Sequence, residues 1–388
     1  MRAETFARQI QKAGIRIVAG VPDSTLRQFC GYINNGGREV FEDHIVTADE
    51  GAAIGIAIGE YLSTGRPACV YMQNSGLGNA VNPITSLANR EVYGIPMLFV
   101  IGWRGEPGSE DEPQHRFMGR ATLGLLELLE IPYAVIDDRT TDAELEKYLE
   151  RAAECFENKE QFALVIKRGA FDKEEEAVYG NVWTMQRERA IEAVVDWLQP
   201  EDIVVSTTGK ISRELYERLD EVKGNHRQAF LTVGGMGHAN MIACQLAKRK
   251  SGRKVVCLDG DGAILMHMGS LAVIGEHPAA NLVHICLNNQ AHESVGGMPT
   301  GAVGVSYSEI ARDCGYTEVY KVTDPEELKD VLSRIRKSEK MVFLEVNVTI
   351  GSRGDLGRPR ETAEDNKTAF MEYLEQNEYG KGIRQERV

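Results

Sequence analysis

Short apolar runs alternate with amphipathic stretches of helical length along nearly all of this 388-residue chain. Short apolar runs bounded by turn residues are typical of strands buried in a parallel sheet. The stretches Glu50–Ser63 and Gly78–Tyr93 between such runs are predicted helices. The predicted strands of the first half are Ile15–Val21, Ala68–Met72, Met97–Ile101, Tyr133–Ile136 and Ala163–Ile166.

The alternation is interrupted once, by the charged stretch from Asp172 to Gly180, which has no periodicity and is predicted to be a linker. Strands that alternate with helices form parallel sheets covered on both faces, so we expect an α/β protein of two doubly wound domains, residues 1–180 and 181–388. The predicted strands of the second half are Ile203–Ser206, Ala229–Val233, Val255–Leu258, Leu282–Leu287 and Val342–Val346. The predicted helices there include Met185–Leu198, Ala239–Lys250 and Pro325–Lys337.

The composition is that of an ordinary globular protein, with 43% hydrophobic and 26% charged residues. A net charge of −14 argues against nucleic acid and anionic membranes as partners, so an anionic substrate would need locally placed cations. The seven cysteines show no CxxC spacing and fall mostly in apolar runs. No apolar leader and no membrane-spanning stretch is seen, and we expect a cytoplasmic protein.

Acidic and amide residues follow two predicted strands of the second domain. Gly260-Asp261-Gly262 comes directly after one apolar run and precedes a predicted helix, Ala263–Glu276, while Asn288-Asn289 ends the next run. The carboxyl ends of parallel strands lie at one edge of the sheet, where backbone N–H groups at a helix start attract a phosphate. Asp261 would be repelled by that phosphate unless a cation lay between them. Carboxylate, amide and phosphate oxygens are ligands of Mg²⁺.

This combination resembles the GDG-to-NN element of enzymes that use thiamine diphosphate as cofactor. The resemblance implies a set of metal ligands and a set of diphosphate contacts. The ligands of Mg²⁺ would be Asp261, Asn289 and the backbone carbonyl of Ala291. The residues at the diphosphate would be Gly260, Gly262 and Ala263, with His292 near the metal.

An enzyme of this kind needs a buried carboxylic acid with a raised pKa, because the cofactor's aminopyrimidine acts as a base only when an acid bonds its N1′. Glu50, in Asp49-Glu50-Gly-Ala-Ala, begins a predicted helix of small apolar residues that would desolvate it. Asp49 is the alternative, although the Glu-Gly-Ala-Ala order is closer to the family pattern. An acidic residue in a first helical turn is also common for electrostatic reasons alone.

Two glycine-rich loops complete the expected cofactor site. By resemblance, Met236 wedges between the two cofactor rings and Gly235 allows close approach, although a core methionine is the simpler interpretation. The loop Asn74-Ser75-Gly76 follows a predicted strand and is expected to line the thiazolium side. Similar enzymes set the first domain of one subunit against the second domain of another. The resemblance therefore implies a homodimer or dimer of dimers with active sites at the subunit interface.

Longer motifs lie along nearly the whole chain. They are Gly20-Val-Pro-Asp-Ser24, Tyr71-Met-Gln-Asn-Ser-Gly-Leu-Gly-Asn79, Ile101-Gly-Trp-Arg-Gly-Glu-Pro-Gly108, Asp111-Glu-Pro-Gln-His115, Asn288-Asn-Gln-Ala-His-Glu-Ser-Val-Gly-Gly297, Ser352-Arg-Gly-Asp-Leu-Gly-Arg358 and Asn366-Lys-Thr-Ala-Phe-Met371. These motifs resemble those of the phosphonopyruvate decarboxylase family of thiamine diphosphate-dependent enzymes. The order of the two domains leaves no room for the middle domain of pyruvate decarboxylases and acetolactate synthases.

The resemblance implies a 2-oxo acid decarboxylase (a carboxy-lyase) that forms phosphonoacetaldehyde and CO₂ from 3-phosphonopyruvate in phosphonate biosynthesis. Sulfopyruvate decarboxylases share the cofactor motifs, so 3-sulfopyruvate stays an alternative substrate. A third alternative is a non-catalytic regulator that binds thiamine diphosphate, which would not need a carboxylic acid at position 50.

The residues that recognise and convert the substrate are less constrained by the sequence. Asp23, Ser24 and His115 are candidates for proton transfer or for orienting the substrate carboxylate. Arginine pairs well with oxyanions, although each single cation is more often a solvated surface residue. The candidate cations are Arg104, Arg116, Lys210, Arg213 and Arg353, together with Arg358 and Arg360.

Overall fold

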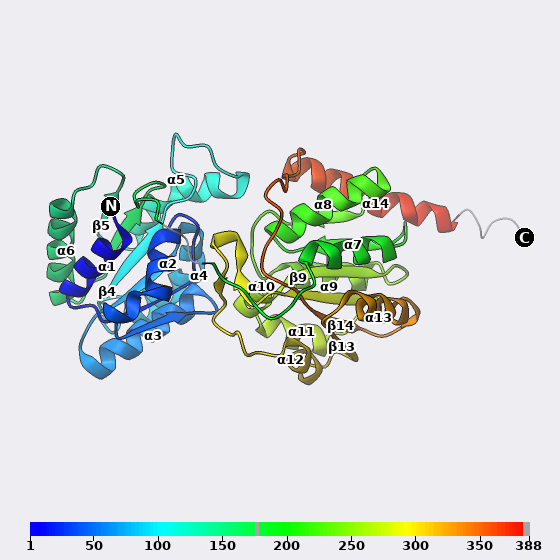
Figure 1. Ribbon diagram of the computed structural model, residues 1–388, viewed down its shortest axis with the longest axis horizontal. Coiled ribbons are helices and arrows are strands. Elements are labelled where there is room, and N and C mark those ends of the chain that lie inside the picture. The colour runs from blue at the N-terminus through cyan, green and yellow to red at the C-terminus, as the bar shows by residue number, and fades with distance from the viewer. Residues whose placement is uncertain (175–177, 383–388) are drawn as a thin grey trace, which may run out of the picture. The chain divides into compact units, whose positions relative to one another are not determined.

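The computed structural model describes residues 1–174 and 178–382. Its contacts divide the chain into two compact units, and both are drawn in Figure 1. The first unit is Met1–Tyr179 with His292–Gly301, and the second unit is Gly180–Ala291 with Ala302–Val388. Glu175 to Ala177, within the expected linker, lie outside the described residues.

The first unit contains a six-stranded parallel sheet in the order β2-β1-β3-β4-β6-β5. Its strands are β1 (Ile17–Gly20), β2 (Asp43–Val46), β3 (Ala68–Gln73), β4 (Met97–Gly102), β5 (Tyr133–Ile136) and β6 (Phe162–Ile166). Its helices are α1 (Ala3–Lys12), α2 (Arg27–Asn35), α3 (Glu50–Thr64), α4 (Leu77–Pro83), α5 (Pro113–Leu128) and α6 (Asp142–Glu157).

Side chains alternate between the two faces of this sheet, and each face is covered by its own helices. Val18 of β1 belongs to the core packed against α1, α2 and α6, whereas its neighbour Ala19 belongs to the core packed against α3, α4 and α5. Both faces of every central strand are therefore apolar, which is why the strands appear in the sequence as continuous apolar runs.

The second unit repeats this architecture, with a parallel sheet in the order β13-β14-β10-β9-β7-β8. Its strands are β7 (Ile203–Ser206), β8 (Ala229–Leu231), β9 (Val255–Gly260), β10 (Leu282–Asn288), β13 (Glu318–Val322) and β14 (Val342–Asn347). One face packs on α7 (Arg187–Trp197), α8 (Lys210–Lys223) and α13 (Pro325–Lys337). The other packs on α9 (Ala239–Arg249), α11 (Gly269–Glu276), α12 (Tyr307–Asp313) and α14 (Ala363–Gly382).

Two predicted helices are wrong in detail. The helix expected over Gly78–Tyr93 ends its regular part at Pro83 and continues only as the π-helical turn Ile84–Ala88, because proline inside a helix removes a hydrogen bond. The helix expected over Ala263–Glu276 is two helices, α10 (Asp261–Met266) and α11, separated at His267 and Met268.

The two all-parallel sheets with helices on both faces confirm the predicted α/β fold. In each sheet the second and third strands along the chain lie on opposite sides of the first, so a switch point lies between β1 and β3 in the first unit and between β7 and β9 in the second. Ligands of such folds bind outside the carboxyl ends of the strands at this switch point. No helix among the described residues is both long and apolar enough to cross a membrane.

Candidate active site

Glu50 begins α3, and the residue before it explains why the helix starts there. Asp49 is extended and its side chain accepts a hydrogen bond from the N–H of Ala52 at 2.9 Å, so it is the N-cap. Glu50 is 4% exposed and lies inside the fold. The two neighbouring carboxylates therefore have different environments. Only Glu50 is buried, which is the environment that the sequence predicts for the acid at the cofactor.

The carboxyl group of Glu50 packs against the loop that follows β3. Burial raises the pKa of Glu50, and a hydrogen bond of 2.8 Å from the Asn79 side chain to Oε2 offsets part of that increase. At Gly76 a Cβ would lie 2.2 Å from Oε1 of Glu50, so only glycine leaves room for the acid. Gly76 thus serves the position of Glu50.

Asp23 lies at the switch point of the first sheet, directly beyond β1, and is completely buried. Its carboxylate accepts hydrogen bonds from the backbone N–H groups of Thr25 (2.7 Å) and Leu26 (3.3 Å), and from the Gln73 side chain at 2.7 Å. Gln73 in turn accepts a hydrogen bond from the Ser75 hydroxyl at 2.7 Å. The loops after β1 and β3 are thereby joined through side chains.

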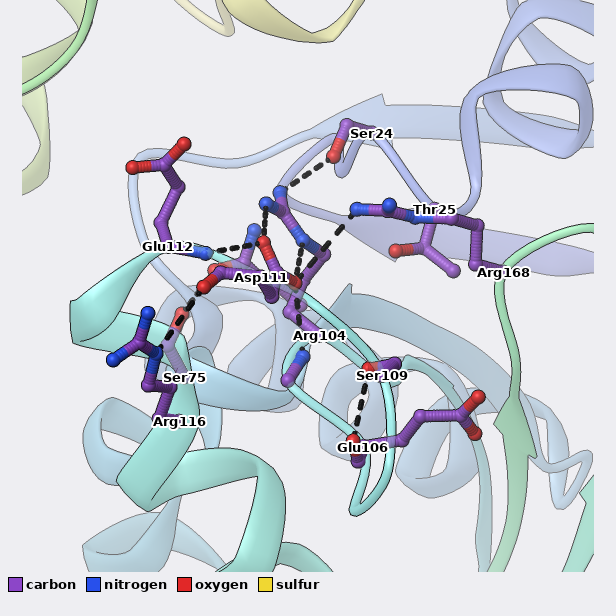
Figure 2. A network of polar contacts seen from close by, with 12 residues as sticks. Ser24, Thr25, Ser75, Arg104, Glu106, Ser109, Asp111, Glu112, Arg116 and Arg168 are labelled. Carbon is purple, nitrogen blue, oxygen red and sulfur yellow. Dashed lines mark hydrogen bonds and ion pairs between the residues drawn. The ribbon is translucent and has the colours of Figure 1, made fainter. Parts of the chain in front are cut away.

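The loop after β4 is attached to the same edge by Arg104. The Asn74 side chain bonds both backbone groups of Arg104, at 2.9 Å to its carbonyl and 3.2 Å from its N–H. The Arg104 guanidinium bonds the Ser24 hydroxyl at 2.9 Å and forms a two-point ion pair with Asp111, as Figure 2 shows. The predicted residues Ser24, Asn74 and Arg104 are therefore brought together.

His115 lies in the first turn of α5, four residues beyond Asp111. Burial and the nearby positive charge of Arg104 lower the pKa of His115, so the imidazole is neutral at neutral pH. Arg116 donates from Nε to the Asp111 carbonyl at 3.4 Å. Both residues thus belong to the Arg104 surroundings.

In the second unit Asp261 follows β9 and is buried. Burial raises the pKa of Asp261 to about 7, although backbone N–H groups of Gly262, Asn289 and Gln290 act in the opposite direction. The contacts with Asn289 and Gln290 place the carboxylate beside the end of β10. The sequence prediction that Asp261 and Asn289 lie at one edge is consistent with this geometry.

The turn that contains Asn289 and Ala291 is held rigidly. The Asn181 side chain donates to the Asn289 carbonyl and to the Val348 carbonyl, each at 3.0 Å. Asn289 accepts the Ala291 N–H at 3.0 Å. Gln290 has a φ of 60°, a left-handed conformation that turns the chain sharply at this point.

Several buried polar atoms at the carboxyl edge of the second sheet have no hydrogen-bond partner among the described residues: Asp261 Oδ2, Thr207 Oγ1, Asn347 Oδ1 and Tyr307 hydroxyl. Thr207 follows β7 and Asn347 ends β14. Burial raises the pKa of Tyr307, and the charge of Asp261 raises it further, so these two groups are neighbours. Unpartnered buried oxygens are costly, and an unpaired buried carboxylate most of all, so this edge fits a cation and polar ligand.

The remaining candidates of the second unit have varied surroundings. Met236 is partly buried between Gly235 and Gly237, whose φ angles are 65° and 87°, so the loop adopts conformations that favour glycine. Lys210 begins α8 beyond β7. Arg213 donates to the carbonyls of Leu356 and Gly357.

Arg353 is paired with carboxylates of its own unit. It forms ion pairs with Glu188 at 2.7 Å, with Asp355 at 3.2 Å and with Glu217.

His292 begins the segment His292–Gly301, which belongs to the first unit. Burial lowers the pKa of His292 to about 4.

Sequence reasoning did not single out Asn79, Asp111 or Asn181, although the structure shows what each holds. Asn79 ends the motif that begins at Tyr71, and Asp111 begins the motif that ends at His115. An asparagine or an aspartate in such a motif does not by itself indicate which side chain it contacts. Asn181 directly follows the expected linker, in a stretch without periodicity.

The chain matches two protein families. Residues 2–122 match the family described as thiamine pyrophosphate enzyme, N-terminal TPP binding domain, and residues 208–346 match the corresponding C-terminal TPP binding domain. Phosphonopyruvate decarboxylases of Streptomyces viridochromogenes and Streptomyces hygroscopicus are each 34% identical over 93% of this chain, covering 92% and 90% of their own lengths. The chain belongs to this thiamine diphosphate-dependent decarboxylase family.

The predicted enzyme class and thiamine diphosphate cofactor are thereby confirmed, and no middle domain is matched between the two domains of this decarboxylase. The sulfopyruvate decarboxylase of Methanosarcina acetivorans is also similar, at 25% identity over 94% of this chain and 96% of that protein. Both substrate classes that the sequence left open are thus represented among the relatives of the decarboxylase.

Proposed function

We propose that this decarboxylase converts 3-phosphonopyruvate to phosphonoacetaldehyde and CO₂, with Mg²⁺ and thiamine diphosphate as cofactors. The observation that carries the choice of substrate is the 34% identity to two phosphonopyruvate decarboxylases, against 25% to the sulfopyruvate decarboxylase over a similar length. Higher similarity over the same span favours the phosphonate as head group.

The proposal of Mg²⁺ rests on Asp261. Its Oδ2 atom is buried and has no hydrogen-bond partner in the part of the chain that the structure describes, and the backbone N–H groups around Asp261 do not offset the desolvation that raises its pKa. A divalent cation held by Asp261, Asn289 and the Ala291 carbonyl would neutralise this charge and attach the diphosphate to the second unit. The diphosphate would then lie beside Gly260, Gly262 and Ala263, at the start of α10.

Bound thiamine diphosphate supplies a nucleophilic carbon and an electron sink for the loss of CO₂. In this proposal the raised pKa of Glu50, which burial causes, favours its protonated form, and this acid would donate a hydrogen bond to the pyrimidine N1′ of the cofactor. Asn79 keeps the Glu50 carboxyl in one orientation through its 2.8 Å bond. Gly76 leaves the space in which the acid lies.

The substrate would meet the polar edge of the first unit. Ser24 and Arg104 offer a hydroxyl and a guanidinium 2.9 Å apart, which suits an oxyanion. Asp23 keeps the loop after β1 in place, and neutral His115 is suited to moving a proton. Arg116, Lys210 and Arg213 are further candidates for binding the anionic groups, whereas the three carboxylates around Arg353 make it the weakest.

The setting we propose is phosphonate biosynthesis in the cytoplasm. Decarboxylation consumes phosphonopyruvate and so draws an unfavourable rearrangement of phosphoenolpyruvate forward. We also propose a homodimer or dimer of dimers whose active sites combine Glu50 of one subunit with Asp261 of another. A mixture of two inactive variants, Glu50→Gln and Asp261→Ala, should then regain activity when subunits exchange, and no regain would contradict the shared site.

Sulfopyruvate decarboxylation is the second candidate, favoured by the full-length similarity to the Methanosarcina acetivorans enzyme. The comparisons do not support a non-catalytic regulator, because the relatives of this chain named above are decarboxylases. The buried acid at Glu50 also speaks against it.

Product analysis with phosphonopyruvate, sulfopyruvate and pyruvate in parallel tests the proposal. Each reaction contains thiamine diphosphate and Mg²⁺, and a matched set contains a chelator. We expect CO₂ and phosphonoacetaldehyde with phosphonopyruvate as the preferred acid, and loss of activity with the chelator. A preference for sulfopyruvate would move the assignment to the second candidate.

A further inference from the structure

The Asp111 carboxylate is the most heavily bonded group of the loop after β4, and its side chain is only 5% exposed. It accepts hydrogen bonds from Arg104 Nε (2.7 Å) and Nη2 (2.5 Å), and from the backbone N–H groups of Gly105 (2.9 Å) and Glu112 (2.8 Å). A second guanidinium, that of Arg168, lies 3.8 Å away. Figure 2 shows these groups converging on Asp111.

The hydrogen bonds to Asp111 favour its ionised form. Burial alone would raise the pKa of Asp111, but the hydrogen bonds from Arg104 and from the Glu112 N–H outweigh it and hold the pKa well below its usual value. A carboxylate that bonds at two points fixes a guanidinium in its plane, because both oxygens engage the planar fork.

Arg104 is consequently held on three sides. Its backbone is bonded by Asn74, its Nε and Nη2 by Asp111, and its Nη1 donates to the Ser24 hydroxyl. The Arg104 side chain is 15% exposed, in the loop after β4 at the carboxyl edge of the sheet. The loop geometry is tight as well, since a Cβ at Gly105 would lie 2.2 Å from the His115 carbonyl.

We propose that Asp111 is a positioning residue for substrate binding: it fixes the Arg104 guanidinium beside Ser24, so that these two groups together bind the oxyanion of the substrate. The inference rests on the proposed function and names the residue that makes its anion site specific. Asparagine cannot replace Asp111, because both carboxylate oxygens accept hydrogen bonds from N–H groups. The NH₂ group of asparagine is itself a donor and would face those N–H groups without an acceptor.

The test compares steady-state kinetics of wild type and Asp111→Asn with phosphonopyruvate. Loss of the fixed guanidinium should raise KM by about tenfold to a hundredfold, the range for one or two charged hydrogen bonds, while kcat stays within roughly threefold. Arg104→Lys keeps the charge but loses the fork, so it should show the same rise in KM. It serves as the second variant if Asp111→Asn does not fold.

A double-mutant cycle separates positioning from general stability. In an Arg104→Met background, Asp111→Asn should change KM by less than about twofold, because the residue that it positions is already gone. The matched control is Asp137→Asn, which removes a loop carboxylate of the same unit that accepts the Arg139 N–H at 2.9 Å. This control should leave KM at the wild-type value.

Two results would overturn the inference: an unchanged KM in Asp111→Asn, or an equally large effect of that change in the Arg104→Met background. If wild type prefers sulfopyruvate, the proposed substrate fails, but the same KM comparison with that acid still decides the role of Asp111, since a sulfonate is also an oxyanion. If wild type converts neither acid, both the proposed function and this inference fail.

Discussion

The carboxyl edges of the two sheets have similar topology, but their buried carboxylates differ in hydrogen bonding. In the first unit Asp23 and Asp111 are surrounded by donors, with three hydrogen bonds to Asp23 and four to Asp111. In the second unit one Asp261 oxygen and the nearby Tyr307 hydroxyl have no hydrogen-bond partner within residues 1–174 and 178–382. The carboxylates of Asp23 and Asp111 are thus satisfied within the first unit, whereas the Asp261 carboxylate is satisfied only in part by the described residues.

The difference teaches which residues bind ligand and which hold others in place. Buried polar groups are normally satisfied, so a satisfied carboxylate has a structural partner while an unsatisfied one points to a missing ligand. Glu50 is intermediate, because one oxygen accepts from Asn79 while burial keeps its pKa raised. That state suits the acid that we propose Glu50 to be.

The largest expected effect comes from Glu50→Gln, which removes the acid of the first unit. Turnover should fall by roughly two to four orders of magnitude while cofactor binding is nearly intact, because the amide cannot donate the same proton. The matched control is Asp49→Asn, which changes the adjacent N-cap carboxylate and should retain most of the turnover. A Glu50→Gln variant with more than half of wild-type turnover would refute the role of Glu50.

The choice of substrate tests whether cations at these edges bind an oxyanion. Pyruvate lacks the phosphonate, so cations of the proposed oxyanion site would be left unpaired. Each lost charged hydrogen bond would reduce the binding free energy by about 1–3 kcal/mol. We expect kcat/KM for pyruvate to be lower by about a hundredfold to several thousandfold. Sulfopyruvate, with one negative charge fewer on its head group, should also react more slowly. Competition assays in which pyruvate is preferred would contradict the charged pocket.

Gly76→Ala should displace the Glu50 carboxyl, since the added Cβ would lie 2.2 Å from Oε1. Misplacing a catalytic group in this way lowers kcat by up to about a hundredfold. Gly78→Ala, two residues further on in α4, is the control, because a Cβ there meets no atom of the described residues within 4 Å. Equal kcat values in the two alanine variants would show that the close packing at Gly76 does not matter for catalysis.

Asp261→Ala tests the open edge of the second unit. Thiamine diphosphate affinity in the presence of Mg²⁺ should fall at least roughly tenfold, the lower range for disturbing a metal site, and the protein should still fold. Calorimetric titration measures this, with the exposed Asp313→Ala of α12 as control. Unchanged cofactor affinity in Asp261→Ala would exclude the proposed Mg²⁺ site.

The smallest expected effect is the pH dependence of stability in the cofactor-free protein. Because burial raises the pKa of Glu50 above its unfolded value, its contribution to stability is fully present below the unfolded pKa and is lost as pH rises through the folded pKa. Glu50→Gln, which has no charge to bury, should therefore become more stable relative to wild type as pH rises. Denaturant unfolding at mildly acidic and mildly alkaline pH measures the difference, and a constant difference would contradict a raised pKa.

Some errors of the sequence analysis have a local physical cause. The strand β2 was not predicted because Asp43 and His44 give it no continuous apolar run, and its residues are only partly buried. The same holds for β13, which is an edge strand of the second sheet. Only its last residue, Val322, is buried. Edge strands lack a neighbour on one side, so their sequences resemble those of loops.

The sequence by itself determined the α/β class, the central strands and the motif residues Glu50 and Asp261. Continuous apolar runs have one good solution, a parallel sheet covered on both faces, and GDG and NN were placed by the strands that they follow. Only the tertiary structure decided that Asp49 caps a helix while Glu50 is buried, and that Asp111 holds Arg104. These roles depend on hydrogen-bond partners and on exclusion of water, which residues acquire only when loops from different strands meet.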